Sequence, residues 1–167
     1  MAEDWIDEIY EAWDREFPGA DTHALKTITR LARLQILLEA FQQEVLAPQG
    51  LVMSDFTLMA ALRRLGKPYQ SRPSDLYDVL ERSSGGMTKM INRLDDLGIV
   101  ERLPDPQDGR VSLVRLTRRG LRVHEQAFSA FLEAAGKLLR GISARRVREI
   151  DGSLQALVSA FEGFFYR

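Results

Sequence analysis

The order of elements between residues 54 and 116 restricts the fold of this 167-residue chain more than any other feature. Apolar periodicity and turn residues predict a helix over 54–65, a short helix over 75–81 and a third helix that ends at Gly98. Two strands follow, over 99–103 and 111–116, joined by the turn sequence PDPQDG. Three helices followed by a two-stranded β-hairpin predict a winged helix-turn-helix in which the third helix enters the DNA major groove.

The helix boundaries are predicted from residues that satisfy free backbone groups at helix ends. Hydroxyl residues that precede apolar periodic segments are typical N-caps, and glycine is typical just after the last turn. The predicted N-caps are Ser54, Ser74, Ser83, Thr117 and Ser143, and Gly66 is predicted to end the first of these helices.

The third helix carries two adjacent glycines, Gly85 and Gly86, in its first turn. Each glycine costs roughly 1 kcal/mol relative to alanine inside a helix, so a function that offsets this cost is expected. Without a Cβ atom, the backbone can approach DNA closely, and helix N-termini attract phosphate. The alternative is a helix that starts only at Met87, which would leave its polar face unchanged.

The polar face of this helix has the composition of a DNA-reading surface. Met87, Ile91 and Leu94 define the opposite, apolar face. Lysine can read guanine, asparagine can read adenine, and serine or threonine can contact phosphate or bases. The predicted DNA-binding residues of the recognition helix are Ser83, Ser84, Gly85, Gly86, Thr88, Lys89, Asn92 and Arg93.

The distribution of charge supports a polyanionic partner. Residues 82–122 contain nine basic and five acidic residues, a net charge of +4, although the whole chain has a formal net charge of −1. Arg110 lies at the predicted hairpin turn, where an arginine can enter a narrow minor groove. Chance clustering of basic residues on a solvated face is the alternative interpretation.

Long amphipathic helices on both sides of this region predict a dimer. The segment 22–46 carries two apolar stripes, so it must be covered on two sides. The final helix has apolar residues at heptad spacing between Val147 and Phe164, which favours a subunit interface over packing within the chain. Another amphipathic helix is predicted over 4–17.

Several other classes of function are disfavoured. The chain has no cysteine, which excludes thiol catalysis and thiol redox sensing. His23 and His124 are too few for a metal cluster, so we expect structural roles for both, with no metal and no cofactor. No nucleotide-binding or catalytic motif is present, so the chain is not expected to be an enzyme. No apolar run approaches membrane-span length, and no signal peptide is apparent, so a cytoplasmic location is expected.

The sequence SSGGMTKMINRLDDLGIVERLPDPQDGRVSLVRLTRRG, residues 83–120, resembles the MarR family of bacterial transcriptional regulators. Helix, Leu-Gly-Ile-Val, Asp-Pro-x-Asp-x-Arg and Leu-Thr-x-x-Gly appear in the family's order and spacing. The resemblance assigns Arg110 to the wing arginine that contacts DNA and Asp108 to the acid that steadies the wing. Gly109 replaces a basic residue that is usual in the family. The helix before Thr22 extends beyond the minimal family pattern.

The resemblance implies a mainly α fold, with long dimerisation helices on both sides of the winged helix-turn-helix. It divides the chain into N-terminal helices over 1–50, a DNA-binding domain over 51–118 and C-terminal dimerisation helices over 119–167. It also implies a homodimer, double-stranded DNA with a pseudo-palindromic operator, and a small apolar or aromatic effector. The effector pocket would lie between the DNA-binding lobe and the dimer helices, and the regulator would act as a repressor. A winged helix that binds only proteins is the alternative.

Overall fold

The computed structural model describes residues 5–80, 83–108 and 112–166. Its helices are α1 (Trp5–Glu16), α2 (His23–Leu46), α3 (Met53–Arg64), α4 (Tyr77–Leu80), α5 (Ser84–Asp96), α6 (Arg118–Leu138) and α7 (Ala144–Phe165). Two short 3-10 turns, η1 (Ala47–Gln49) and η2 (Pro73–Leu76), and three strands, β1 (Gln70–Ser71), β2 (Val100–Pro104) and β3 (Ser112–Leu116), complete it. The mainly helical winged fold expected from the sequence is confirmed.

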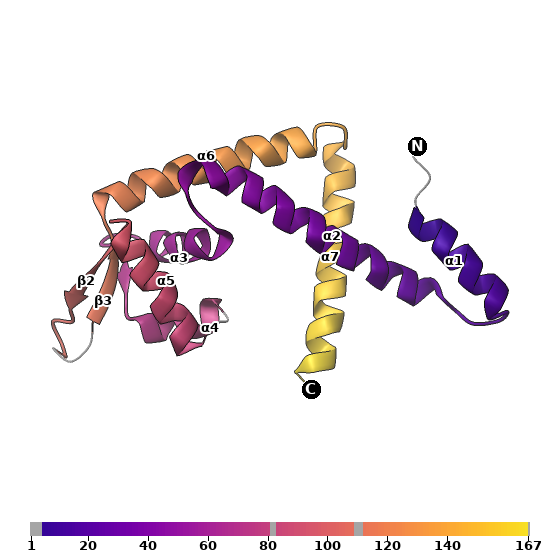
Figure 1. Ribbon diagram of the computed structural model, residues 1–167, viewed down its shortest axis with the longest axis horizontal. Coiled ribbons are helices and arrows are strands. Elements are labelled where there is room, and N and C mark those ends of the chain that lie inside the picture. Colours follow the sequence, from indigo (N-terminus) through magenta and orange to yellow (C-terminus); the bar gives the residue numbers. More distant parts are fainter. Residues whose placement is uncertain (1–4, 81–82, 109–111, 167) are drawn as a thin grey trace.

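A lobe and a set of long helices make up the molecule (Figure 1). The lobe contains α3, α4, α5 and the sheet, and α6 leads out of it. Helices α2 and α7 cross away from the lobe, and α1 lies at the far end of α2. One end of α2 therefore lies near the lobe, and its other end lies beside α1.

The wing is a three-stranded antiparallel sheet with strand order β1-β3-β2. Strands β2 and β3 pair from Val100↔Leu116 to Pro104↔Ser112, as a hairpin requires. Strand β1 has no counterpart among the elements predicted from the sequence. Gln70 pairs with Arg115 of β3, on the side of β3 opposite to β2. These two positions are far apart in sequence, and a strand of two residues is too short for its composition to predict it.

Most predicted caps are confirmed. The side-chain oxygens of Ser83, Thr117 and Ser143 accept the backbone N–H groups of Gly86, Gly120 and Arg146, respectively. Gly66 ends α3 with a positive φ of 76°.

The predicted caps at Ser54 and Ser74 are wrong. Ser54 lies inside α3, because Asp55 Oδ2 accepts the backbone N–H of Val52 at 3.1 Å and so moves the helix start upstream. Ser74 lies inside η2, because Pro73 begins that turn with its fixed φ and has no N–H to satisfy.

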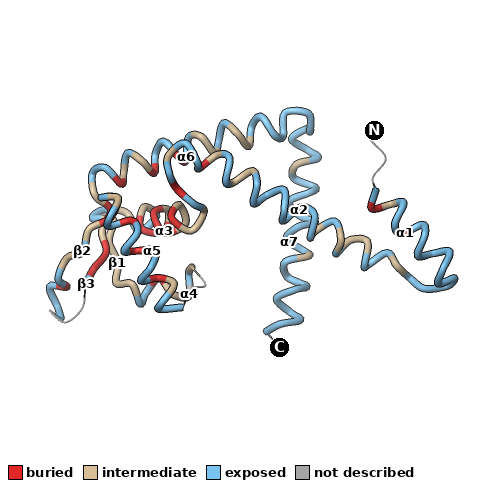
Figure 2. Tube along the Cα trace, in the orientation of Figure 1, coloured by how far each residue is buried: buried red, intermediate tan, exposed pale blue. Residues whose placement is uncertain are grey.

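The hydrophobic core lies in the lobe, where α3, α5 and the sheet meet (Figure 2). Its largest fully buried apolar side chains are Leu46, Leu58, Met59, Leu62, Met87, Ile91, Leu94, Val100 and Val114. The predicted inward face of the recognition helix is therefore confirmed.

The long helices are almost uncovered. Helix α7 has no buried residue among those described, and α2 has only Leu46. Large apolar side chains such as Leu25 and Ile36 on α2 and Phe161 on α7 are exposed to water. Within the described ranges, no individual helix has the length and hydropathy to cross a membrane. Only α2 with η1 and α3 reach that length and hydropathy together, and they are bent by 75° at their junction.

Candidate nucleic-acid interface

The first turn of α5 presents bare backbone to solvent. Ser83 caps the helix, and α5 begins at Ser84, so both glycines belong to the first turn and the late start at Met87 is wrong. A Cβ atom at Gly85 would have no neighbour within 4 Å, and one at Gly86 would meet only Ser83 Oγ at 3.4 Å. Because the fold leaves room for side chains at both positions, packing within the chain does not explain the glycines.

The structure brings all eight predicted residues of the recognition helix to one exposed end and side of α5. Gly86 is half-buried and the others are exposed: Ser83, Ser84, Gly85, Thr88, Lys89, Asn92 and Arg93. Lys89 makes no hydrogen bond or ion pair with any described residue. Thr88 Oγ1 donates to Ser84 O at 2.9 Å. Lys89 therefore has the least constrained polar side chain on this face.

Arg93 is exposed but bonded to neighbouring residues of the protein, so it is not free on this face. Its Nε donates to Asp55 Oδ2 at 3.0 Å and its Nη2 donates to Gly50 O at 3.0 Å. These contacts fasten α5 to the start of α3, although 48% of the Arg93 side chain stays exposed. Arg93 can therefore contact phosphate only through the guanidinium N–H groups that these two hydrogen bonds leave free.

Asp55 was not predicted as a site residue from the sequence, yet it connects the start of α3 to Arg93 of α5. Its side chain is 1% exposed, it caps α3 and it accepts from Arg93, while its Oδ1 is buried without a partner in the described part of the chain. An acid three residues after a helix N-cap is a known signal for a capping box. The predicted cap at Ser54 obscured that signal.

Asp55→Ala is expected to lower the free energy of unfolding by about 2 kcal/mol, because it removes a helix cap and the acceptor of a charged hydrogen bond. Urea denaturation at fixed protein concentration measures the change. Asp55→Asn is the matched comparison, because both N–H groups bond to the same oxygen, Oδ2, and an amide oxygen in its place can still accept both. Only the negative charge is lost, so the loss of stability should be smaller. Equal stability of wild type and Asp55→Ala would contradict the assignment of Asp55 as the organising residue.

A second connection joins the recognition helix to the wing. Arg102 of β2 donates through Nη2 to Asn92 Oδ1 at 2.7 Å, and its Nε lies 3.9 Å from Asp95. This bond fixes the Asn92 amide with its NH2 group available for an outside acceptor. Arg102 was not predicted as a site residue, because its partners lie on another element.

The base of the wing is fixed by Asp105, which is almost fully buried. It accepts from Arg72 Nε at 2.6 Å and from the Gln107 backbone N–H at 2.8 Å. These two donors, the Gln107 N–H first, hold the pKa of Asp105 below its usual range. Asp108, predicted as a wing residue, is exposed beyond this anchor, whereas Arg110 and Gly109 lie outside the described residues.

A cavity of about 490 Å³ opens between α3 and α6. His124 lies in its wall, 7% exposed, with its ring parallel to that of Phe56 at a centroid distance of 5.4 Å. The ring of Phe128 lies 6.1 Å from His124. His124 Nε2 is buried and has no partner among the described residues. Burial first, and then the positive charge of Arg63, lowers the pKa of His124 below its usual value of 6.5, while Glu125 opposes this.

Folding stability should therefore depend on His124 at mildly acidic pH. The unfolded chain binds a proton near pH 6.5 and the folded chain binds it only at lower pH. The stability from neutral His124 is thus complete above pH 6.5 and is lost as the pH falls below it. Thermal melts between neutral and mildly acidic pH should show this loss in wild type and a smaller loss in His124→Phe. Identical pH profiles would contradict the prediction.

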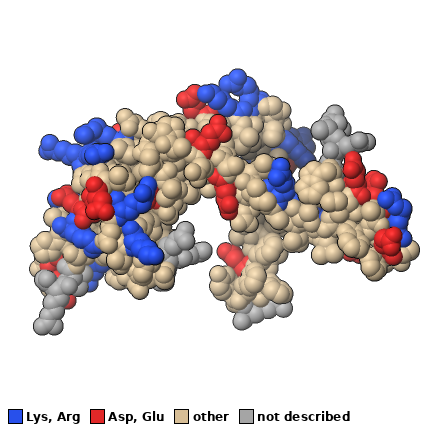
Figure 3. All heavy atoms as spheres, in the orientation of Figure 1, with Lys and Arg blue, Asp and Glu red and all other residues tan. Residues whose placement is uncertain are grey.

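The electrostatic character of the lobe fits a polyanion. Lys and Arg side chains gather over α5 and over the start of α6, with acidic side chains between these two groups, whereas the surface of α7 in this view is mostly uncharged (Figure 3). Within the described residues, no group of three or more His, Asp or Glu side chains could hold a metal ion.

Comparison with known proteins places these features in one family. The MarR family model matches residues 51–112, from just before the start of α3 to the first residue of β3. The regulator PecS of Dickeya dadantii is 26% identical over 94% of this chain and 92% of its own. The multiple antibiotic resistance protein MarR of Escherichia coli is 36% identical over 50% of this chain and 56% of its own.

Solved structures agree with this placement. A MarR mutant from E. coli complexed with operator DNA has a TM-score of 0.68 and 26% identity, covering 83% of this chain and 99% of that one. The winged helix-turn-helix fold of this chain and its similarity to these regulators identify it as a DNA-binding transcriptional regulator. Residues 51–112 match the MarR family model, and the chain is similar over most of its length to regulators of that family.

Proposed function

We propose that this regulator acts as a homodimer that recognises a pseudo-palindromic operator through α5 and the wing. The observation that carries the proposal is the exposed, glycine-bearing N-terminus of α5 with Lys89 free beside it. The proposed recognition residues are Ser83, Ser84, Gly85, Gly86, Thr88, Lys89, Asn92 and Arg93, and the proposed wing residues are Asp108 and Arg110. Because DNA is in the bacterial cytoplasm, we place the protein there.

The accessible surface of the single chain supports the homodimer. A compact monomer of 19.0 kDa would expose about 8,400 Å². This chain exposes 12246 Å², an excess of about 3,850 Å² per subunit. Two subunits therefore have more excess surface than the roughly 2,000–5,000 Å² in total that large obligate interfaces bury. Accordingly, we assign residues 1–50 and 119–167 to dimerisation and residues 51–118 to DNA binding.

We further propose that a small apolar or aromatic effector controls DNA release from the cavity between α3 and α6. Its lining combines aromatic rings with charged groups: Phe56, Ala60, Arg63, Arg64, His124, Glu125 and Phe128. The cavity touches both the lobe and the helix that leaves it, so a bound molecule can bias their relative position. Effector and DNA would then weaken each other's binding by the same factor. We propose on this basis that the protein is a ligand-responsive repressor.

Footprinting on genomic fragments, followed by binding to the protected duplex over a salt series, tests the DNA-binding proposal. Phosphate contacts release counterions, so affinity should fall steeply with salt, and the footprint should show two related half-sites. Binding of an asymmetric half-site as tightly as the full site would contradict the dimeric arrangement. Binding without salt dependence would favour a winged helix that contacts proteins instead. The relatives named above are transcriptional regulators, and we propose no enzyme activity.

A thermal-shift screen with aromatic compounds, repeated in the presence of operator DNA, tests the effector proposal. A ligand should raise the melting temperature of the free protein and release DNA, and the substitution Phe128→Ala should weaken both effects. A ligand that stabilises the protein equally with Phe128→Ala binds elsewhere and would overturn this assignment of the cavity.

A further inference from the structure

Helix α1 is fixed on the N-terminal part of α2 by one side only. Ile6 and Tyr10 are 3% and 8% exposed. Tyr10 Oη and Thr29 Oγ1 share a hydrogen bond of 2.7 Å, and Asp7 forms ion pairs with Lys26 and Arg30. These contacts determine which side of α1 remains for another surface.

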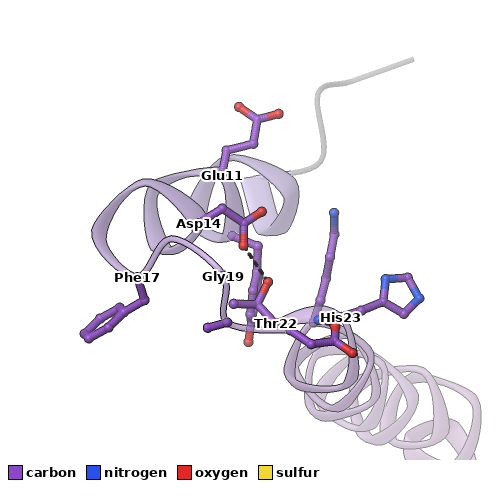
Figure 4. Close-up of a pocket in the computed structure, with 10 residues that line it drawn as sticks. Glu11, Asp14, Phe17, Gly19, Thr22 and His23 are labelled. Carbon is purple, nitrogen blue, oxygen red and sulfur yellow. Dashed lines mark hydrogen bonds between the residues drawn. The ribbon is translucent and has the colours of Figure 1, made fainter.

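The side that α2 leaves uncovered is strongly apolar. Trp5, Ile9, Trp13 and Phe17 follow one another at intervals of four residues and are 49%, 41%, 48% and 58% exposed. The rings of Trp13 and Phe17 lie 5.6 Å apart, and Phe17 points away from the junction between α1 and α2 (Figure 4). We call these four residues the aromatic stripe. A continuous patch of this kind marks a docking surface.

The charges around the stripe restrict its occupant. Residues 5–16 contain five acidic residues and one basic residue. Glu8, Glu11 and Glu16 are exposed on the same helix. An acidic helix is repelled by anionic lipid headgroups and by DNA, so a protein surface is the compatible occupant.

The rest of the molecule indicates which protein surface this is. Helix α2, on which α1 lies, has exposed apolar residues of its own, such as Leu25 and Ile28, and belongs with α7 to the uncovered surface assigned above to the homodimer. Helix α1 also lies at the end of α2 that is remote from its own lobe (Figure 1). A stripe on a helix that is remote from its own lobe and packed on the proposed dimer helix α2 is well placed for contact with the second copy.

We infer that the aromatic stripe of α1 docks on the second copy of this chain and extends the dimer interface beyond α2 and α7. The inference rests on the proposed homodimer. It gives a role to a helix that the family resemblance leaves outside the minimal pattern. Burial of the stripe removes large aromatic surfaces from water and so contributes directly to subunit affinity.

The natural sequence supplies a direct probe of this inference. Trp5 and Trp13 are the only tryptophans among the 167 residues, and both belong to the stripe. Tryptophan emission and acrylamide quenching of the unmodified full chain therefore report on this surface alone. Light scattering measures the mass of the same samples over a dilution series. We expect emission to shift to the red and quenching to rise as the dimer dissociates.

Three variants make the test specific. Ile9→Glu keeps both tryptophans and should raise the dimer dissociation constant about tenfold or more, by placing a charge inside an apolar contact. Glu8→Ala, on the polar side of the same helix, is the matched control and should change it little. Phe161→Glu on α7 should yield monomers with fully accessible tryptophans. Helical content by circular dichroism checks that each variant folds, and the wild-type dilution series supplies monomers if Phe161→Glu does not.

The possible outcomes separate the inference from the homodimer itself. A dimer whose tryptophans are quenched as strongly as in the monomer overturns the docking of α1 and leaves the homodimer intact. Tryptophans that are shielded in the monomer also overturn it, because the chain then covers its own stripe. A monomer at every concentration overturns both proposals. Shielding that appears and disappears with the dimer mass supports the inference.

Discussion

Lys89→Ala is expected to weaken operator binding by about 1–3 kcal/mol per half-site, roughly 5- to 150-fold. Lys89 lies one turn into α5, is exposed and makes no hydrogen bond or ion pair with the described residues, so its ammonium group is available to guanine O6 and N7. Because a dimer loses the contact in both half-sites, the total loss should be larger. Fluorescence anisotropy should also show relaxed preference at one operator position.

A charge-matched control separates base reading from general attraction. Arg119→Ala removes one positive charge from the exposed start of α6. It should reduce affinity for all duplexes slightly and leave sequence preference unchanged. Equal losses for Lys89→Ala and Arg119→Ala on every sequence would show that Lys89 acts only through net charge.

Gly86→Ala tests the close approach of backbone to DNA with the same assay. The Cβ atom has ordinary contact distance to Ser83 Oγ in the free protein, so stability should hold or rise by about 0.5–1 kcal/mol. DNA affinity should nevertheless fall, because the added methyl group separates the helix from the phosphates. Wild-type affinity in Gly86→Ala would contradict this explanation of the glycines.

Gly120→Ala is expected to have the largest effect on folding, a loss of about 3 kcal/mol and roughly 10 °C in melting temperature. A Cβ atom at Gly120 would lie 2.0 Å from Ile99 O and 3.0 Å from the Ile99 carbonyl carbon, both backbone atoms. Ile99 O cannot move away cheaply, because it accepts the backbone N–H and the hydroxyl of Thr117. The helix α6 and the strand β2 must therefore separate.

Gly136→Ala on the same helix is the matched control for this prediction. Gly136 is exposed, and a Cβ atom there would have no neighbour within 4 Å. Alanine should therefore stabilise α6 by about 0.5–1 kcal/mol through its higher helix propensity. Melting at one protein concentration compares the two variants, since a dimer's melting temperature depends on concentration. Equal stability of Gly120→Ala and wild type would contradict the close approach of α6 to β2.

The features that the sequence by itself determined are those with local causes. Met87, Ile91 and Leu94 recur at helical spacing, and their burial follows from that spacing alone. The cap at Ser83 needs only a hydroxyl and an N–H three residues later. The hairpin of β2 and β3 is formed by neighbours in sequence, joined by a short turn.

The tertiary structure alone decided which polar residues of the site are free and which are tied. Arg93 and Lys89 are both basic residues on the exposed side of α5, and no pattern in the helix distinguishes them. Arg93 donates to Asp55, which lies 38 positions away in sequence. This contact connects Arg93 to α3, while Lys89 remains free. The pairing of β1 and the burial of His124 against Phe56 likewise join distant positions. Periodicity and capping act within a few residues, whereas these contacts exist only once packing has brought separate elements together.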